Sequence, residues 1–210
     1  MISISVRSQR FAMKNTTDNK IKAVLFDCFG VLVRGTFHDT YRLAGGNPFA
    51  DHEFIENLLA KVNSGEITEA EFNGAICNKI GISFNEWDIC IDRSETVNEQ
   101  LLEYIAKIRR KYKTAIVSNA SSGVVESKIG SIRLKEIFDA VVVSAEVGYM
   151  KPDPMIYRIT ADRLSVKPED CIFVDDKQSY CRAAQALGMT VVLYKYLDQL
   201  KQDITTILNW

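Results

Sequence analysis

The stretch Ala23-Val-Leu-Phe-Asp-Cys-Phe-Gly-Val-Leu32 begins with four apolar residues and then places an aspartate, Asp27, directly after them. A short apolar run without polar alternation is typical of a β-strand that is covered on both faces. Four further runs of this kind follow, and helical patterns separate the later ones. Strands that alternate with helices predict an α/β fold with a doubly wound parallel sheet. The further runs are residues 114–117, 140–143, 171–174 and 190–194, and the helical patterns are residues 122–137, 154–164 and 179–187.

A long insertion separates the first run from the second. Residues 27–113 are far more than a crossover connection needs, and the patterns within them are mostly helical. Thr68 and Ser83 each stand three residues before a glutamate, which is the capping box that opens a helix. Apolar residues recur at helical spacing over residues 98–112, which predicts a helix that returns to the core. We therefore expect a small inserted helical cap over residues 36–97.

The rest of the chain divides between a core and a tail. We expect residues 20–35 and 98–210 to form the core that contains the sheet. Residues 1–19 are polar and lack the apolar segment of a secretory signal, so we predict a disordered N-terminal tail there.

The composition narrows the class of protein and its surroundings. Among 210 residues, 26 Lys and Arg residues stand against 27 Asp and Glu residues, so the formal net charge is −1. That balance gives no bulk field to recruit nucleic acid or an anionic membrane, and no apolar stretch approaches the roughly 20 residues of a membrane span. The five cysteines form no Cys-x-x-Cys pair. We therefore predict a cytoplasmic protein without disulfides or a zinc site, while its oligomeric state stays open.

Polar side chains stand where the predicted strands end. Asp27 follows the first strand, Ser118-Asn119 the second, Gly148-Tyr-Met-Lys-Pro-Asp-Pro154 the third and Asp175-Asp176 the fourth. In an open α/β sheet, ligands bind outside the carboxyl ends of the strands. A single polar residue after a strand is usually a turn former or a helix cap. Four such groups in this order predict a functional site instead.

The chemistry of this set indicates group transfer. Clustered carboxylates repel one another unless a cation lies between them, and Mg²⁺ prefers oxygen ligands while keeping waters and substrate phosphate oxygens. Asp27 can then attack as a covalent nucleophile. Ser118 and Lys151 supply a hydrogen bond and a positive charge to the transferring group.

The motifs Phe26-Asp-x-x-Gly-Val-Leu32, Ser118-Asn119, Val147-Gly-x-x-Lys-Pro-Asp-Pro154 and Asp175-Asp176 resemble, in this order, the four motifs of the haloacid dehalogenase-like hydrolases. The helical insertion is similar to the cap of the subfamily that contains dehalogenases and small-molecule phosphatases. The resemblance implies a Rossmann-like core, Mg²⁺ as cofactor and a small phosphorylated substrate. By that resemblance the catalytic residues are Asp27, Ser118 and Lys151, the substrate-binding residues are Ser118, Asn119 and Lys151, and the metal ligands are Asp27, the carbonyl of Phe29, Asp175 and Asp176.

One motif residue departs from the family pattern. The phosphatases of the family usually carry a second aspartate two residues after the nucleophile, as general acid and base, where this chain has Phe29. General acid–base catalysis by such a group typically raises the rate roughly 10²–10⁴-fold. Three hypotheses follow: a phosphatase whose proton transfer falls to water or the leaving group, a dehalogenase-like hydrolase with an aromatic residue at this position, or a phosphometabolite-binding pseudoenzyme. The first is favoured, because the pair Asp175-Asp176 without a metal would work against an attacking anion.

Several side chains outside the motifs receive simpler interpretations. Arg34, His38 and Arg42 are candidates to contact the substrate, but a solvated loop face is the default for them. Trp87 stands at helical spacing, which predicts the core of the cap, and His52 is expected in a surface loop. Tyr180 occupies a position where relatives often have Asn, at the start of the expected last core helix.

Overall fold

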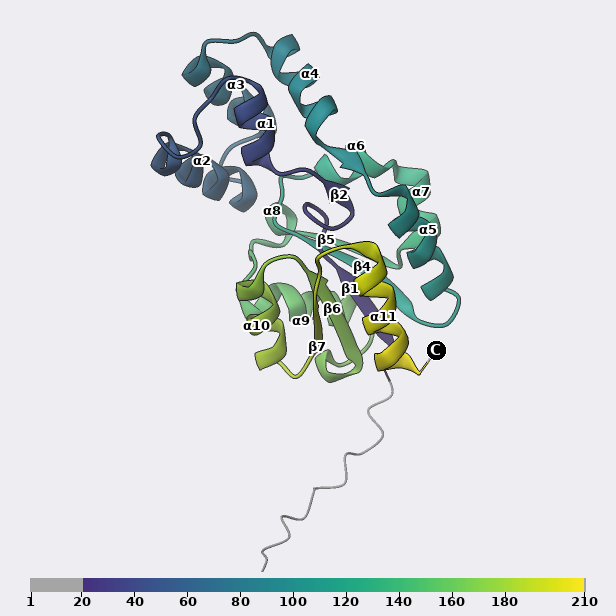
Figure 1. Cartoon of the computed structure of the whole chain (residues 1–210). Helices are drawn as coiled ribbons and strands as arrows, with labels where there is room; N and C mark the ends of the chain where they lie inside the picture. Colours follow the sequence, from purple (N-terminus) through teal and green to yellow (C-terminus); the bar gives the residue numbers. More distant parts are fainter. Residues whose placement is uncertain (1–20, 210) are drawn as a thin grey trace, which may run out of the picture.

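The structure is a computed structural model that describes residues 21–209, and its centre is a five-stranded parallel sheet. The strands lie in the order β5-β4-β1-β6-β7 (Figure 1). Because β1 lies in the middle with β4 and β6 on either side, the carboxyl ends of these three strands are neighbours. The α/β prediction with a doubly wound parallel sheet is confirmed. The strands are β1 Ala23–Phe26, β4 Lys113–Ser118, β5 Ala140–Val143, β6 Cys171–Asp175 and β7 Thr190–Leu193.

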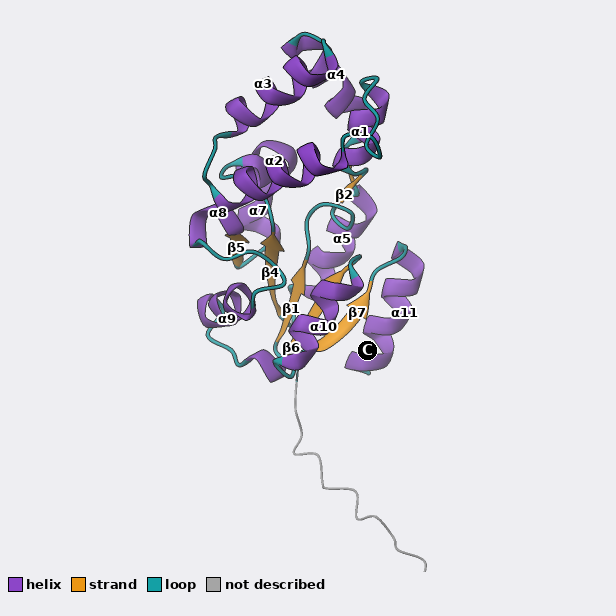
Figure 2. Cartoon of the chain, turned by 90° about the vertical axis from the view of Figure 1, so that its left-hand side faces the viewer, coloured by secondary structure: helices purple, strands orange, loops and turns teal. Residues whose placement is uncertain are grey.

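Helices cover both faces of the sheet, as Figures 1 and 2 show. Successive side chains of β1 point to opposite faces. Val24 and Phe26 pack into one buried cluster with α5, α6, α7 and α11, while Ala23 and Leu25 pack into another with α9 and α10. Burial on both faces explains why the strand is apolar without alternation. The helices are α5 Glu99–Ile108, α6 Val124–Ile129, α7 Ser131–Ile137, α8 Ser144–Val147, α9 Pro154–Arg163, α10 Gln178–Ala186 and α11 Leu197–Leu208, with a 3₁₀ turn at Pro168–Asp170.

The core differs from the expected element list in two places. The single helix expected over residues 122–137 is two helices, because Gly130 has a φ of +92° and cannot continue a right-handed helix. Its N–H bonds to the carbonyl of Glu126 and its own carbonyl accepts from Leu134, so it ends α6 and begins α7. The helix of Tyr180, α10, is not the last, because α11 follows it and packs Leu200 and Ile204 against the sheet.

Residues between β1 and α5 form a helical insert with its own buried cluster. Its helices are α1 Phe37–Leu43, α2 His52–Ser64, α3 Glu69–Ile80 and α4 Phe84–Ser94. The capping boxes expected at Thr68 and Ser83 are present, and Thr36 forms a third with Asp39. Trp87 is 1% exposed within this cluster, as expected. His52 is exposed but opens α2, so the expected surface loop was wrong there.

The insert leaves and rejoins the sheet through two short paired strands. β2 Val33–Arg34 and β3 Thr96–Val97 run antiparallel. The guanidinium of Arg34 donates to the side-chain oxygen of Asn98 at 2.9 Å, and Asn98 is buried. The two chain segments that connect the insert to the core therefore lie side by side, next to the loop of residues 27–32 that follows β1. The division into a core and a cap at residues 36 and 97 stays a prediction, and the tail predicted for residues 1–19 lies outside the described residues.

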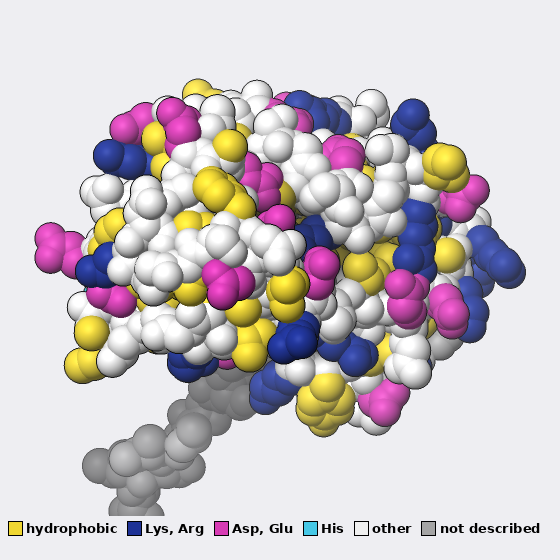
Figure 3. Space-filling view, turned by 90° about the horizontal axis from the view of Figure 1, so that it is seen from above, with side chains coloured by type: hydrophobic (Ala, Val, Ile, Leu, Met, Phe, Trp, Pro, Cys, Tyr) yellow, Lys and Arg dark blue, Asp and Glu magenta, His cyan; other side chains and the backbone are white. Residues whose placement is uncertain are grey.

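The surface agrees with the near-neutral net charge. Seen from the side of the insert, basic and acidic side chains are interspersed (Figure 3). Within residues 21–209, no helix combines the length and the apolar character that crossing a membrane would require. The five cysteines are all free thiols.

Candidate active site

The register of the parallel strands brings the predicted groups to one edge. Asp27 directly follows β1, Ser118 is the last residue of β4, and Asp175 is the last residue of β6. Phe26 pairs with both Ile116 and Val174, so the three strands end side by side. The prediction that these groups converge at the carboxyl ends was therefore correct in its geometry.

Lys151 links two of the buried carboxylates. Its Nζ donates to Asp27 Oδ1 at 2.6 Å and to Asp175 Oδ2 at 2.8 Å. The ammonium also lies 5.0 Å from the ring centre of Tyr180, and this cation–π contact further stabilises the charged form of Lys151. Burial alone would lower the pKa of Lys151, but the charges of Asp27 and Asp175 outweigh it and raise that pKa above the usual value. Lys151 is therefore a permanent cation in the site.

Asp27 sits in an environment that disfavours its charge. Burial raises its pKa to about 7, and the charges of Asp175 and Asp176 add to that effect, while Lys151 opposes it. The carboxylate accepts from the N–H of Cys28 at 2.7 Å and from Lys151, both through Oδ1. No hydrogen bond from the described residues reaches Oδ2. That oxygen is the one left free for a ligand or an electrophile.

The three carboxylates form a set that suits a divalent cation. One oxygen each of Asp27, Asp175 and Asp176 lie within 4.8 Å of one another. The three ionised carboxylates and Lys151, which bonds to two of them, together carry a formal charge of −2. Burial, followed by the charge of Asp175, raises the pKa of Asp176, and Asp176 has no ion pair among the described residues. An oxygen-rich, net-negative set of this kind matches the ligand preference of Mg²⁺.

Gly30 makes room for the exposed member of this set. A Cβ at Gly30 would lie 2.5 Å from Asp176 Oδ2, so the carboxylate would have to move, and the φ of Gly30 is +94°. Glycine is favoured here because L side chains rarely adopt this backbone conformation, and it leaves the carboxylate in place beside the loop of residues 27–32. Gly30 directly follows Phe29, whose carbonyl is the fourth predicted metal ligand. The residues present therefore fit a magnesium site.

Ser118 and Asn119 behave differently although they are adjacent. Ser118 is 1% exposed, and its Oγ has no hydrogen-bond partner among the described residues. An unpaired buried hydroxyl costs free energy, which an oxyanion ligand would recover. Asn119 is occupied instead: its Oδ1 accepts from the Lys151 N–H at 2.7 Å, and its Nδ2 donates to the Lys151 carbonyl at 2.8 Å. Asn119 thus holds the backbone of Lys151, and its contact with a substrate stays a prediction.

The remaining candidates have structural partners. Phe29 is partly buried and packs against the buried cluster that contains Val24 and Phe26. Arg34 bonds to Asn98, Arg42 pairs with Asp39 on the surface at 2.7 Å, and the ring of His38 contacts Phe37 edge-on. Arg34 and Arg42 are exposed, as the solvated-face interpretation predicts, and His38 is partly exposed. The expected loop was wrong, because Arg34 lies in β2 and the other two lie in α1. Sequence reasoning missed the part played by Tyr180, whose ring contacts Lys151 and whose hydroxyl lies 3.4 Å from the Asn119 amide.

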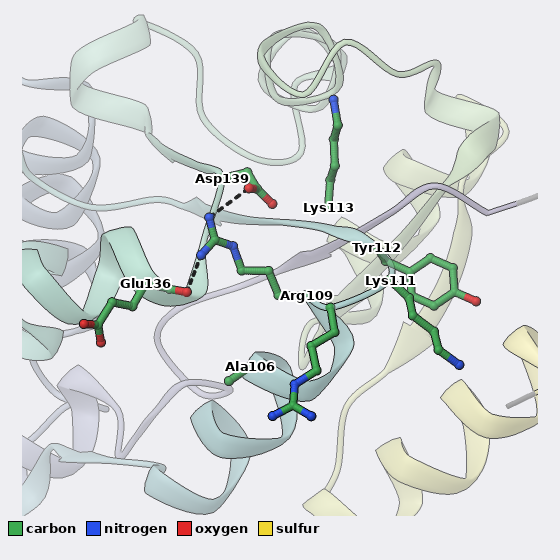
Figure 4. A pocket seen from close by; sticks show the side chains of 8 residues that line it. Ala106, Arg109, Lys111, Tyr112, Lys113, Glu136 and Asp139 are labelled. Carbon is green, nitrogen blue, oxygen red and sulfur yellow. Dashed lines mark hydrogen bonds and ion pairs between the residues drawn. The ribbon is translucent and has the colours of Figure 1, made fainter.

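A groove of about 540 Å³ lies far from these groups, at the amino ends of β1 and β4. Figure 4 shows that its basic side chains point in different directions. Arg109 is turned toward Asp139, with which it pairs at 3.0 Å, and Lys113 donates to the carbonyl of Leu164 at 2.6 Å. Side chains that diverge and are already bonded do not form a site for a small ligand.

The parallel sheet and the carboxylates at its strand ends define an α/β protein with a candidate active site, and comparison with known proteins gives its family. The chain belongs to the haloacid dehalogenase-like hydrolases, whose family model matches residues 21–188. The resemblance seen in the sequence is thereby confirmed at the level of the superfamily.

Individual relatives agree with this family. Bifunctional epoxide hydrolase 2 of Sus scrofa is 25% identical over 89% of this chain, which spans only 39% of that protein. Pyrophosphatase PpaX of Bacillus thuringiensis is 25% identical, with 88% of this chain and 91% of the relative covered. A family enzyme from Bacteroides thetaiotaomicron, solved with magnesium and inorganic phosphate, superimposes with a TM-score of 0.68 at 23% identity and covers 83% of this chain and 94% of its own. At that identity, the last likeness shows the fold alone.

Proposed function

We propose that this chain is a Mg²⁺-dependent phosphatase of a small organic phosphate that acts through an aspartyl-phosphate at Asp27. The observation that carries the proposal is the site itself: three carboxylates within 4.8 Å, a buried lysine between two of them, and an unpaired hydroxyl at Ser118. The solved relative with magnesium and phosphate supports the choice of ligand. The curated relatives that carry phosphatase names support the choice of reaction.

Each residue has a distinct task in this reaction. Asp27 Oδ2 attacks the phosphorus, and the bond from phosphorus to the leaving oxygen breaks with its electron pair on that oxygen. Lys151 holds Oδ1 and offers positive charge to the phosphoryl oxygens, while Ser118 Oγ donates to one of them. Water then attacks the acyl phosphate, which releases phosphate and restores Asp27. Asp27, Asp175, Asp176 and the Phe29 carbonyl would hold Mg²⁺, which would supply further charge neutralisation to the phosphoryl group.

Proton transfer is the step for which the first motif offers no group. Phe29 has no titratable atom, so the leaving oxygen must take its proton from water or already carry a low pKa. We therefore expect substrates with good leaving groups, such as aryl and acyl phosphates, to be turned over faster than alkyl phosphates. Without general acid catalysis, esters with poor leaving groups should react more slowly by roughly 10²–10⁴-fold.

A panel of phosphorylated metabolites and aryl phosphates tests the proposal. We expect phosphate release with Mg²⁺ and its loss after EDTA, and restoration when Mg²⁺ is added again. Crystals soaked with beryllium fluoride and Mg²⁺ should show an adduct on Asp27. Release of halide from 2-haloacids without metal, together with no phosphatase activity, would refute this function and favour the dehalogenase hypothesis.

Phe29 favours one second candidate, a protein that binds phosphate esters without turning them over. The substitution Phe29→Asp separates the two. If the wild type is a phosphatase limited by proton transfer, Phe29→Asp raises kcat on an alkyl phosphate by roughly 10²-fold. Tight binding of phosphate esters without turnover in either the wild type or the variant would favour the binding protein.

A further inference from the structure

The short helix α8 joins the helical insert to the loop that follows β4. Ser144, the first residue of α8, is fully buried. Its Oγ accepts from the N–H of Ala120 at 3.1 Å and donates to the carbonyl of Asn63, near the end of α2, at 2.6 Å. A hydroxyl has one proton to donate and lone pairs to accept with, so both bonds form together. Among the described residues, the carbonyl of Ala120, at 3.3 Å, is a second and more distant acceptor for that proton.

The contact around Ser144 is close on the side of the insert. Gly65 ends α2 with a φ of +78°, and a Cβ added to it would lie 3.2 Å from the carbonyl oxygen of Ala145. The N–H of Ala145 in turn bonds to the carbonyl of Ala120 at 3.4 Å. The end of α2, the start of α8 and the loop after β4 are therefore packed backbone against backbone, and a shift of one is transmitted to the others.

The loop that Ser144 holds carries groups of the site. Ala120 lies two residues after Ser118 and directly follows Asn119, which holds the backbone of Lys151 through two hydrogen bonds. A displacement of this loop would move the Ser118 hydroxyl and the Lys151 ammonium together. A misplacement of about 1 Å at reacting groups can lower a rate by roughly 10²-fold.

We propose that Ser144 is a positioning residue that couples the helical insert to the Ser118-Asn119 loop. Through its two hydrogen bonds, the insert docked on α8 fixes the loop in the position that the site requires, and an insert that lifts from α8 releases the loop. The catalytic consequence rests on the proposed phosphatase function. The mechanical coupling does not, so the two can fail separately.

Hydrogen exchange of the full chain tests the coupling without any assay of activity. In Ser144→Ala, the N–H of Ala120 loses its acceptor and Asn63 loses its donor, so we expect faster exchange, by about tenfold or more, both at Ala120 and at residues 64–68. Thermal unfolding confirms that the variant is folded. Ser122→Ala is the matched control, because Ser122 bonds to Glu146 of the same helix at 3.1 Å on the exposed surface without reaching the insert. Faster exchange at only one segment, or equal effects of the two variants, would overturn the proposal.

A second variant approaches the coupling from the insert. Gly65→Ala places a methyl group against the carbonyl of Ala145 and strains a left-handed backbone, while Ser144 and the loop keep their sequence. We expect exchange at Ala120 to rise in this variant as well. An unchanged rate at Ala120, with the insert disturbed at residues 64–68, would contradict the proposed coupling.

Turnover gives the catalytic arm of the test. We expect Ser144→Ala to lower kcat by about tenfold with less than about a threefold change in KM, and Ser144→Thr, which keeps the hydroxyl, to recover most of the loss. A raised KM with an intact kcat would contradict a positioning role. A wild type without phosphatase activity refutes the proposed function alone, since the exchange pattern still decides the coupling.

Discussion

The two ends of the central sheet treat charge in opposite ways. At the carboxyl end, Lys151 is shared by two buried carboxylates, and Asp176 forms no ion pair with a described residue. At the amino end, Asp170 and Asp139 each have a partner of their own: Lys22 pairs with Asp170 at 2.5 Å, and Arg109 pairs with Asp139. The groove of Figure 4 lies at this amino end. The comparison teaches that carboxylates buried with too little counter-charge, rather than a hollow in the surface, locate the site in this molecule.

The physical reason is the free energy of holding like charges together. Desolvation of an ion is costly, and a protein that keeps Asp27 and Asp175 buried must offset that cost with a partner. Lys151 offsets part of it, and the raised pKa of Asp27 agrees with a cost that is only partly offset. A bound cation would supply the missing charge. At the amino end, Asp170 and Asp139 already have cationic partners and need no bound cation to offset their charge.

The largest expected effect comes from removing one carboxylate at each end. Asp27→Asn keeps the shape of the side chain but removes the proposed nucleophile, so we expect kcat with Mg²⁺ to fall by about 10⁴-fold or more. Asp139→Asn removes the partner of Arg109 and should change kcat by less than about twofold. Steady-state kinetics on the best phosphate ester measures both. Residual activity of Asp27→Asn above about one hundredth of the wild type would place the nucleophile elsewhere.

Stability should show the same asymmetry through the two lysines. Lys151→Met leaves Asp27 and Asp175 buried without a counter-charge, which should lower the free energy of unfolding by about 3–5 kcal/mol. Lys22→Met also removes the partner of a buried carboxylate, Asp170, but only one carboxylate loses its partner and the lysine is largely exposed to water, so the loss should stay at about 1 kcal/mol. Urea unfolding in EDTA compares the two. Equal losses would mean that the ends are energetically alike and would break the comparison.

Mg²⁺ should stabilise the chain through the carboxyl end alone. At free Mg²⁺ near 100 times its Kd, binding to the folded state adds about 2.7 kcal/mol to the free energy of unfolding. We expect the Tm to rise accordingly, and EDTA or Asp176→Asn to abolish the rise. Asp170→Asn, at the amino end, should keep it. A Mg²⁺ effect that survives Asp176→Asn would locate the cation outside the carboxylate set.

The smallest effect concerns Glu69, a carboxylate of the insert that bonds to Ser121 of the loop after β4. Burial of part of this group raises its pKa, with Ser121 and Lys128 opposing the shift. The folded state therefore keeps the proton to higher pH than the unfolded state, and the associated stability is lost as the pH rises through the folded pKa. Glu69→Gln avoids that loss, so it should be more stable than the wild type at pH 8 but not at pH 4.

Solvent screening keeps this gain below about 0.5 kcal/mol. Thermal unfolding at both pH values measures it, with Glu103→Gln on the exposed face of α5 as the control. A gain at pH 4 that equals the gain at pH 8 would show that the charge of Glu69 is not its cause.

The sequence predicted the sheet and the location of the site for one physical reason. Apolar runs such as residues 171–174 identify strands covered on both faces, and parallel strands end at one edge, so the residue after each run is placed without knowledge of distances. The family resemblance then assigned roles to Asp27, Ser118 and Lys151. Those roles remain proposals, whereas the convergence of the side chains is seen in the structure.

What the sequence did not provide depends on tertiary contacts. That Lys151 bridges Asp27 and Asp175, and that Asn119 holds the backbone of Lys151, follows from how the loop before α9 folds back, which no spacing encodes. The break at Gly130 needed its backbone angle, since an isolated glycine is also tolerated within helices. α11 was missed although Leu200 and Ile204 recur at helical spacing, so that signal was available.

The pairing of β2 with β3 has a consequence for how this protein can change. Val33 lies opposite Val97, and Arg34 lies opposite Thr96. The roughly sixty residues between β2 and β3 therefore form one long connection between two adjacent antiparallel strands. An insertion, deletion or replacement within that connection changes the insert without changing the strand order of the five-stranded sheet. Evolution or a protein engineer can therefore vary the insert while the ends of β1, β4 and β6, and the side chains held there, stay as they are.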